Sequence, residues 1–371
     1  MNARTLAPSP SRRGVAAPLA CAVPFACAAA IVAGGAAAAD RPFSSASPWN
    51  TAIPSSAVYG SAPAAPGLLA GVDSWDAQNV WSIPFYRATT ADASRPLLYN
   101  PLAWYKVFTG EWRRAGNGAA VEAEILASSK TAFPYPGNVY STTKAGAWTL
   151  PSSYNKTLNP ASPPARFYVG AAMKPATGAD GHMAVAQPNG SVLETYATIV
   201  LGSGQLVALS YAVSSATGLG DGWQNGQTAS MLPSYAGLLC DEELAAGVRH
   251  AMAISAPASL LATQIAYPAY AFDRDATTNQ QPYSGALPMG ARLALPPSVS
   301  VASLKLATAE GAAIAAAAKT YGFIIVDRGG SGATIRVNPN CAAANPVLRA
   351  WSYGLQNDLN AIFSRLTRVG W

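Results

Sequence analysis

Residues 180–198 read DGHMAVAQPNGSVLETYAT and decide the fold of this chain. Two short runs, 182–187 and 192–198, are rich in apolar and β-branched residues, a composition that favours strands. Between them, Pro188-Asn189-Gly190 supplies the residues that tight turns prefer. The stretch therefore predicts a β-hairpin that carries ionisable side chains on its strands and at its start.

The pattern of short strands and turns continues on both sides of this hairpin. The chain has 32 glycines and 29 prolines among 371 residues, which suits many strands joined by turns. Further strands are expected at 80–86, 121–126, 165–172, 205–213, 291–295, 323–326 and 334–337, and helices at 241–247, 303–321 and 347–366. We therefore expect a mainly β fold, with an antiparallel β-sandwich or jelly-roll-like body and a few packed helices in the C-terminal third.

The first 39 residues are typical of a secretory signal peptide. A basic stretch precedes an apolar run at 15–32, and the small residues Ala37 and Ala39 fit the cleavage rule. The arginine pair at 12–13 leaves both the general and the twin-arginine export routes open. Residues 40–371 are then expected to form a single β-rich domain with an extended lead-in, in a secreted or periplasmic protein without stable membrane insertion.

Charge and composition narrow the class of partner. Three arginines leave with the signal, so the formal net charge falls from +6 to +3, and we expect no nucleic-acid binding. Charged residues make up only 11% of the chain, whereas it has 16 tyrosines and 9 tryptophans. Aromatic platforms and neutral polar groups suit sugar rings, so an extracellular polysaccharide is the expected partner.

Histidine is scarce, because the chain has only two. On a strand, His182 shares a face with Ala184 and Ala186, which predicts that it faces a cleft or a second sheet. Asp180 is expected to orient the imidazole, and Glu194 to lie near it on the next strand. The alternatives are a general base with carboxylate support, or a structural histidine beside a turn aspartate.

The second histidine and the cysteines have similar alternatives. His250 alternates with Met252 and Ile254 on an apolar face, which predicts either a buried, hydrogen-bonded histidine or a second catalytic group. After cleavage of the signal, Cys240 and Cys341 remain, and they form either one disulfide or two buried thiols. No metal-ligand spacing such as His-x-His occurs, so we expect neither a metal nor a cofactor.

Several segments resemble a group of exported bacterial proteins. The segments that carry the resemblance are Ser47-Pro48-Trp49-Asn50, Asp180-Gly181-His182-Met183, Asp241-Glu242-Glu243, His250-Ala251, Leu287-Pro288-Met289-Gly290 and Tyr321-Gly322 followed by Asp327. The resemblance covers most of the mature chain. It implies that the two histidine segments belong to one compact domain.

Three functions fit these residues. A polysaccharide lyase uses a base such as His182, a tyrosine acid and an arginine that neutralises the uronate carboxylate. A glycoside hydrolase uses two carboxylates, drawn here from Asp180, Glu194, Asp221 and Glu243. A non-catalytic carbohydrate-binding protein uses Trp75, Trp81, Trp104 and Trp112 as platforms. We favour the lyase, with His182, Asp180, His250 and Glu194 as catalytic candidates and Arg249, Tyr168, Tyr196 and Trp223 as substrate-binding candidates.

Overall fold

The computed structural model describes residues 41–61, 63–64, 70–72, 81–133, 166–178, 180–224, 226–273, 275–341 and 353–371. The predicted signal peptide, Trp75 and the first part of the last expected helix lie outside these residues. Within them, strands are more abundant than helices, so the mainly β prediction is confirmed. The sandwich or jelly-roll arrangement stays a prediction.

The predicted hairpin is formed by β6 (Met183–Ala186) and β7 (Ser191–Tyr196). The two strands pair antiparallel with Ala184 opposite Glu194, and Gly190 takes a φ of 84° in the turn between them. A left-handed conformation of this kind favours glycine. The hairpin lies inside a four-stranded sheet whose order is β10 (Ser210–Ser215), β7, β6 and β3 (Phe85–Arg87).

A seven-stranded sheet forms the second body of strands. Its order is β1 (Val58–Tyr59), β17 (Thr367–Gly370), β14 (Arg292–Ala294), β15 (Phe323–Gly329), β11 (Met252–Pro257), β16 (Ala333–Ile335) and β2 (Ala70–Val72). Its central strands β11 and β15 run parallel, which corrects the expectation of an antiparallel body. A parallel pair needs a crossover connection, and the chain between these strands includes a helix that serves as one.

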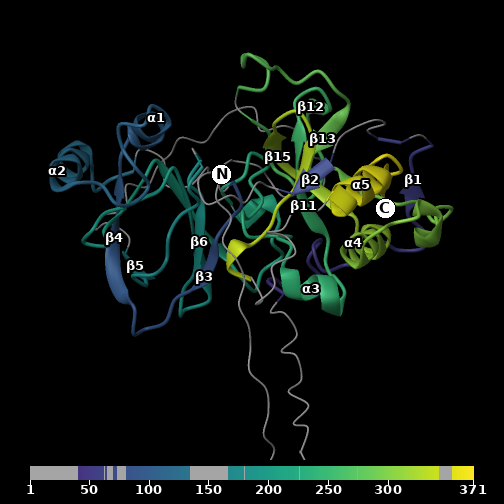
Figure 1. The fold of residues 1–371 in the computed structure, drawn as a ribbon, viewed down its shortest axis with the longest axis horizontal. Helices are drawn as coiled ribbons and strands as arrows, with labels where there is room; N and C mark the ends of the chain where they lie inside the picture. Colours follow the sequence, from purple (N-terminus) through teal and green to yellow (C-terminus); the bar gives the residue numbers. More distant parts are fainter. Residues whose placement is uncertain are drawn as a thin grey trace, which may run out of the picture. The chain divides into compact units, whose positions relative to one another are not determined.

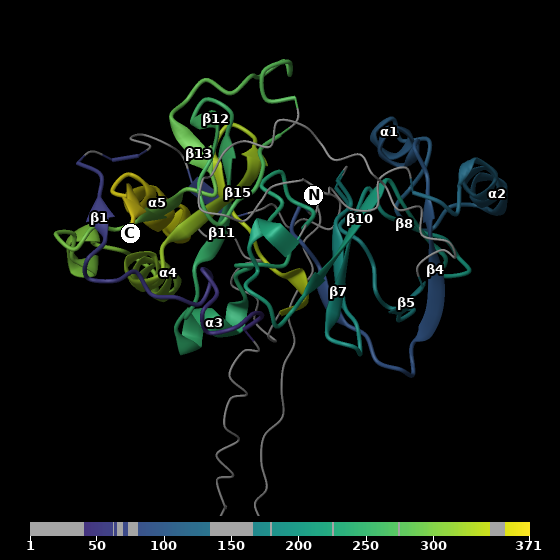
Figure 2. The ribbon, with the colours of Figure 1, turned by 180° about the vertical axis from the view of Figure 1, so that it is seen from behind.

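Two helices cover one face of this sheet. They are α4 (Ala309–Thr320) and α5 (Tyr353–Phe363), and Ile314 and Leu359 from them join Ile254 and Ile325 in one buried cluster. The two helices lie beside β11 in the views from both sides (Figures 1 and 2). The Thr308 hydroxyl caps α4 by accepting a hydrogen bond from the Gly311 N–H at 2.9 Å.

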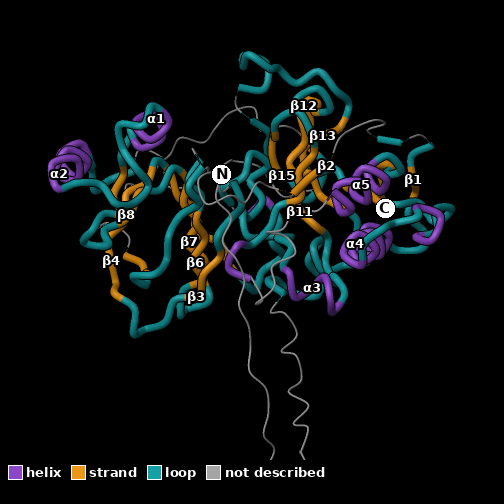
Figure 3. Tube along the Cα trace, in the orientation of Figure 1, coloured by secondary structure: helices purple, strands orange, loops and turns teal. Residues whose placement is uncertain are grey.

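A further four-stranded sheet consists of β5 (Arg166–Val169), β4 (Ala93–Tyr99), β9 (Leu206–Ala208) and β8 (Ile199–Val200). Helices α1 (Ala103–Phe108) and α2 (Ala119–Ser128) pack against it through Ala103, Ile125 and Val207. The strand expected at 121–126 is therefore wrong, because the alanines and glutamates of this segment favour a helix. Figure 3 shows these helices beside the strands.

Short elements complete the described part of the chain. They are the strand pair β12 (Leu261–Ile265) and β13 (Leu287–Met289), helix α3 (Asp241–Ala246) and the 3-10 turns η1 (Gly222–Gln224), η2 (Val301–Leu304) and η3 (Pro339–Cys341). Within the described residues, none of the helices combines the length and the apolar character needed to span a bilayer.

The β6–β7 hairpin is buried on both of its faces. Met183 and Val185 pack with Leu193 into the cluster that also holds the β4–β5 strands. On the opposite face, Ala184 packs with Ala253 of the seven-stranded sheet. Since side chains alternate along a strand, His182 lies on the same face as Ala184, toward the seven-stranded sheet. Of the two surroundings predicted for His182, a cleft or a second sheet, this is the second.

Candidate active site

His182 lies directly before β6 and is buried, with 5% of its surface exposed. Its Nδ1 atom is buried and makes no hydrogen bond among the described residues. Burial lowers the pKa of the imidazole to about 4, and the charges of Arg336 and Arg114 act in the same direction, whereas Asp180 opposes them. The ring is therefore neutral at neutral pH and keeps a free lone pair or N–H on Nδ1.

Tyr196 is the cross-strand neighbour of this histidine. The register of β6 and β7 brings their rings together, with centroids 5.2 Å apart. The Tyr196 hydroxyl donates a hydrogen bond to Asp180 Oδ1 at 3.2 Å. Burial raises the pKa of this hydroxyl well above its usual range, and the Asp180 carboxylate raises it further, so the tyrosine stays protonated.

Asp180 binds the tyrosine and a tryptophan. Besides Tyr196, the indole Nε1 of Trp104 donates to Asp180 Oδ1 at 3.4 Å. The sequence predicts that Asp180 orients the imidazole through a hydrogen bond, whereas these contacts show that it orients the phenol and acts on His182 through its charge.

Gly181 gives the turn before His182 its shape. It has a φ of 50°, and a Cβ at this position would lie 2.5 Å from Arg114 Nε. The Arg114 guanidinium in turn donates from Nη1 to the Thr198 carbonyl at 3.2 Å and from Nε to the Gly178 carbonyl at 3.4 Å. Only glycine fits both the backbone angle and the close approach of this arginine.

The seven-stranded sheet adds a second charged group to the site. Ser255 and Asp327 are register partners on β11 and β15, and Arg336 follows β16. Arg336 donates from Nε to Ser255 Oγ at 3.0 Å and from Nη2 to Asp327 Oδ2 at 2.9 Å. Burial raises the pKa of Asp327 to about 7, Arg336 opposes the shift, and the carboxylates of Asp273 and Asp180 add to it.

Arg336 and Asp327 are site residues that the sequence analysis missed. The sequence predicts a strand only at 323–326, but β15 continues through Asp327 to Gly329 after an irregularity in the register of β11 and β15. The sequence does contain a signal, because Thr334 and Arg336 alternate with Ile335 and Val337 and so mark one polar face of a strand.

Glu194 has a different environment from His182. Its buried carboxylate accepts hydrogen bonds from the backbone N–H groups of Ser234 at 2.6 Å and Gln227 at 3.1 Å, and from the Ser214 hydroxyl at 2.7 Å. Burial raises the pKa of this carboxyl against the effect of these donors. These contacts tie the 226–234 segment to the hairpin, which is a structural role.

His250 is part of a second cluster. It is also buried, and its Nε2 lies 3.0 Å from Glu243 Oε1, while Nδ1 lies 2.9 Å from the Ala251 carbonyl. Although burial lowers the pKa of His250, the Glu243 carboxylate outweighs it, and the net pKa is raised. These contacts fit the first of the two alternatives for His250, a buried, hydrogen-bonded histidine with a structural role.

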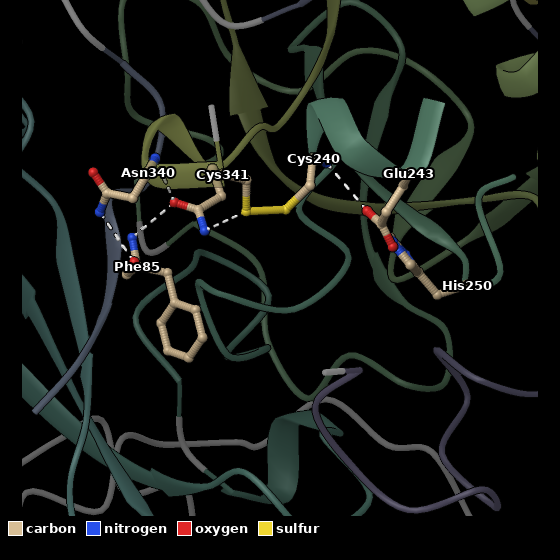
Figure 4. The surroundings of a disulfide bond; sticks show 7 residues. Phe85, Cys240, Glu243, His250, Asn340 and Cys341 are labelled. Carbon is tan, nitrogen blue, oxygen red and sulfur yellow. Dashed lines mark hydrogen bonds and ion pairs between the residues drawn. A yellow bond between two sulfur atoms is a disulfide. The ribbon is translucent and has the colours of Figure 1, made fainter. Parts of the chain in front are cut away.

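A disulfide lies beside this second cluster, joining Cys240 to Cys341 (Figure 4). Glu243 accepts a hydrogen bond from the Cys240 N–H at 3.1 Å at the start of α3. On the other side of the bond, Asn338 donates to Cys341 Sγ at 2.9 Å and accepts from the Phe85 N–H at 3.1 Å. The disulfide therefore links the His250 cluster to β3, the neighbour of β6.

The remaining substrate-binding candidates have other surroundings. Arg249 is exposed, and its carbonyl accepts a hydrogen bond from Arg41 at 2.8 Å. Tyr168 lies on β5, where its N–H donates to Gln187 Oε1 at 2.8 Å. Trp223 is 45% exposed and contacts Tyr270, with ring centroids 5.7 Å apart. None of these contacts involves His182.

Comparison with protein-family models, curated proteins and solved structures found no match to this chain. Among the described residues, one group has its potential metal-ligating atoms close together: Cys240, Glu242 and Cys341. The sulfurs of that group are bonded to each other, and a disulfide does not supply the thiolates that metals bind. The chemical groups that the described residues bring to the site are the neutral imidazole of His182, the protonated phenol of Tyr196 and the guanidinium of Arg336.

Proposed function

We propose that this protein is an exported polysaccharide lyase in which His182 is the general base and Tyr196 the general acid. One observation carries the proposal: the buried Nδ1 of His182 makes no hydrogen bond within the part of the chain that the structure describes, and its ring lies beside the protonated phenol of Tyr196. A neutral imidazole, which has one ring nitrogen able to accept a proton, and a phenol that holds a proton are the two groups that β-elimination needs.

The reaction follows from these two groups. His182 takes the proton on the carbon next to the uronate carboxylate, and the electron pair of that C–H bond forms a carbon–carbon double bond. The bond to the glycosidic oxygen breaks as the double bond forms. Tyr196 gives its proton to the leaving oxygen, and the proton on His182 later restores the tyrosine directly or through solvent.

Aromatic side chains next to Asp180 support a sugar substrate. Trp104, which hydrogen-bonds Asp180, stacks on Phe108 with ring centroids 4.9 Å apart. Phe108 is 65% exposed and Tyr105 on the same helix is 57% exposed. Such faces suit sugar rings, and α1 thus offers a platform beside the acid–base pair. By contrast, Trp112 is buried, so it is not a platform.

The test compares wild type, His182→Ala, Tyr196→Phe and Tyr168→Phe on acidic and neutral polysaccharides. We expect wild type to form unsaturated uronate ends, detected by their ultraviolet absorbance, and both site variants to lose this activity by about 10²–10⁴-fold. Tyr168→Phe is the matched control and is expected to keep it. Cleavage by wild type that survives in both site variants would refute the proposal.

A glycoside hydrolase is the second candidate, and one observation favours it. Burial raises the pKa of Asp327 to about 7, the Asp180 carboxylate adds to this shift, and such a pKa suits the general acid of a carboxylate pair. Of the four carboxylates expected from the sequence for this role, the pair keeps Asp180, whereas Glu194 and Glu243 have hydrogen-bond partners of their own. Reducing ends without unsaturated products, lost in Asp327→Asn, would establish this function instead.

A further inference from the structure

Arg336 is held by two neighbours and carries one nitrogen without a partner. Its Nε and Nη2 bind Ser255 and Asp327, but Nη1 is buried and makes no hydrogen bond among the described residues. Its side chain is only 9% exposed. A buried, charged N–H group without an acceptor is costly, and natural proteins rarely keep one without a reason.

This nitrogen belongs to the same region as the proposed base. Ser255 and Asp327 are partners across β11 and β15. Ala253 of β11 and Val326 of β15 pack in one cluster with Ala184, on the His182 side of the hairpin. The charge of Arg336 reaches the imidazole, because it lowers the pKa of His182. Two partnerless nitrogens, one cationic and one basic, therefore occupy one region.

We propose that Arg336 Nη1 binds the carboxylate of the uronic acid unit from which His182 removes the proton, and that Arg336 thereby selects acidic over neutral sugars. The guanidinium matches a carboxylate in charge and in planar geometry. When the neighbouring carbon loses its proton, negative charge moves onto the carboxylate, where Arg336 stabilises it. The uronate identity rests on the proposed function, whereas the anion receptor rests on the geometry of Arg336.

The surrounding carboxylates permit a second anion at this place. Asp327 is the ion-pair partner of Arg336, and burial raises the pKa of this carboxyl to about 7. A protonated Asp327 leaves the positive charge of Arg336 available to a substrate carboxylate. Arg249, the arginine expected from the sequence to have this role, is exposed and bonded through its carbonyl to Arg41.

The experiment measures binding without turnover. In the His182→Ala background, polygalacturonate, alginate and hyaluronan are titrated by calorimetry, each as the acid and after reduction of its carboxyl groups to alcohols. We expect at least one polymer to bind more tightly as the acid. Arg336→Gln should weaken that binding about 10- to 100-fold and leave the reduced polymer unaffected.

Three further variants serve as controls. Arg249→Gln removes an exposed arginine and is expected to change nothing. Arg336→Lys keeps the charge and should keep part of the preference for the acid. Because Arg336→Gln leaves Asp327 without its partner, Arg336→Gln with Asp327→Asn provides a variant without an unpaired buried carboxylate, and circular dichroism checks that it folds.

The outcomes separate this inference from the proposed function. The absence of any preference for the acid, or a preference that persists in the folded double variant, overturns the receptor. An Arg336-dependent preference without unsaturated products from wild type keeps the receptor and refutes the elimination. Elimination by wild type that is unchanged in Arg336→Gln keeps the proposed lyase function and overturns the role of Arg336 as the carboxylate receptor.

Discussion

The two histidine regions begin alike and end with opposite electrostatics. His182 and His250 are both buried, and each follows a glycine with positive φ, Gly181 and Gly247. Yet the pKa of His182 is lowered and that of His250 is raised. The difference is a direct acceptor, because Glu243 contacts His250 whereas Asp180 accepts its hydrogen bonds from Tyr196 and Trp104. Burial alone therefore does not decide the charge of a histidine.

The largest expected difference between the two regions is catalytic. His182→Ala should reduce the formation of unsaturated ends by about 10²–10⁴-fold, because it removes the base. His250→Gln should leave the rate per folded molecule within about twofold, since its contacts are structural. Initial rates on the same acidic polymer, corrected for the folded fraction, check this pair. Equal losses in both variants would erase the distinction between the regions.

The next effect is on stability, and here the His250 region is expected to show the larger loss. His250→Ala leaves the buried Glu243 carboxylate without its ion-pair partner, which should lower the free energy of unfolding by about 3–5 kcal/mol. Urea unfolding at neutral pH measures this change. Adding Glu243→Gln to His250→Ala should restore part of it. A double variant no more stable than His250→Ala would contradict the ion-pair explanation.

The two glycines offer a smaller contrast. Gly181→Ala places a Cβ 2.5 Å from Arg114 Nε, whereas a Cβ at Gly247 has nothing within 4 Å. Both alanines meet the cost of a positive φ, on the order of 1–3 kcal/mol, but only Gly181→Ala must also displace the arginine. We expect Gly181→Ala to be the more destabilising and to slow catalysis. Equal unfolding midpoints would show that Arg114 yields freely.

The smallest effect is the slope of stability with pH. Between the folded pKa of about 4 and the usual 6.5, the unfolded chain binds a proton at His182 that the folded chain does not, so this group makes stability rise with pH. His250 has a raised pKa, so its contribution is complete below 6.5 and is lost as pH rises through its folded pKa. Wild type minus His182→Gln and wild type minus His250→Gln should therefore have opposite slopes in unfolding titrations. Slopes of the same sign would contradict the assignment.

Local patterns in the sequence predicted the hairpin. For each histidine they left two alternatives open, a catalytic group and a structural one. The turn at Pro188-Asn189-Gly190 fixed the register of β6 and β7, and the register placed Tyr196 across from His182. The alternation of side chains along this strand predicts on which face of the sheet Glu194 lies, but not which groups donate hydrogen bonds to it. Those partners come from the 226–234 segment, whose position depends on tertiary packing.

The missed residues lie far from the hairpin in sequence. Arg336 and Asp327 reach the site because β11 pairs with β15 on one side and β16 on the other, a strand order that no local pattern contains. The segment 121–126 was mispredicted for a local reason. Its apolar residues favour a strand, but the helix propensity of its alanines prevails, and the segment is helical. Arg249, next to His250 in the sequence, is exposed, and its carbonyl accepts a hydrogen bond from Arg41.

The disulfide has a consequence for resistance to proteolysis. Cys240 and Cys341 are 101 positions apart, and the chain between them includes β11, β14, β15 and β16. A protease that cuts an exposed loop in this interval therefore produces two fragments that stay covalently joined. The segments that carry Ser255, Asp327 and Arg336 remain attached to the rest of the protein after such a nick, and only a reductant would let the pieces separate on a gel.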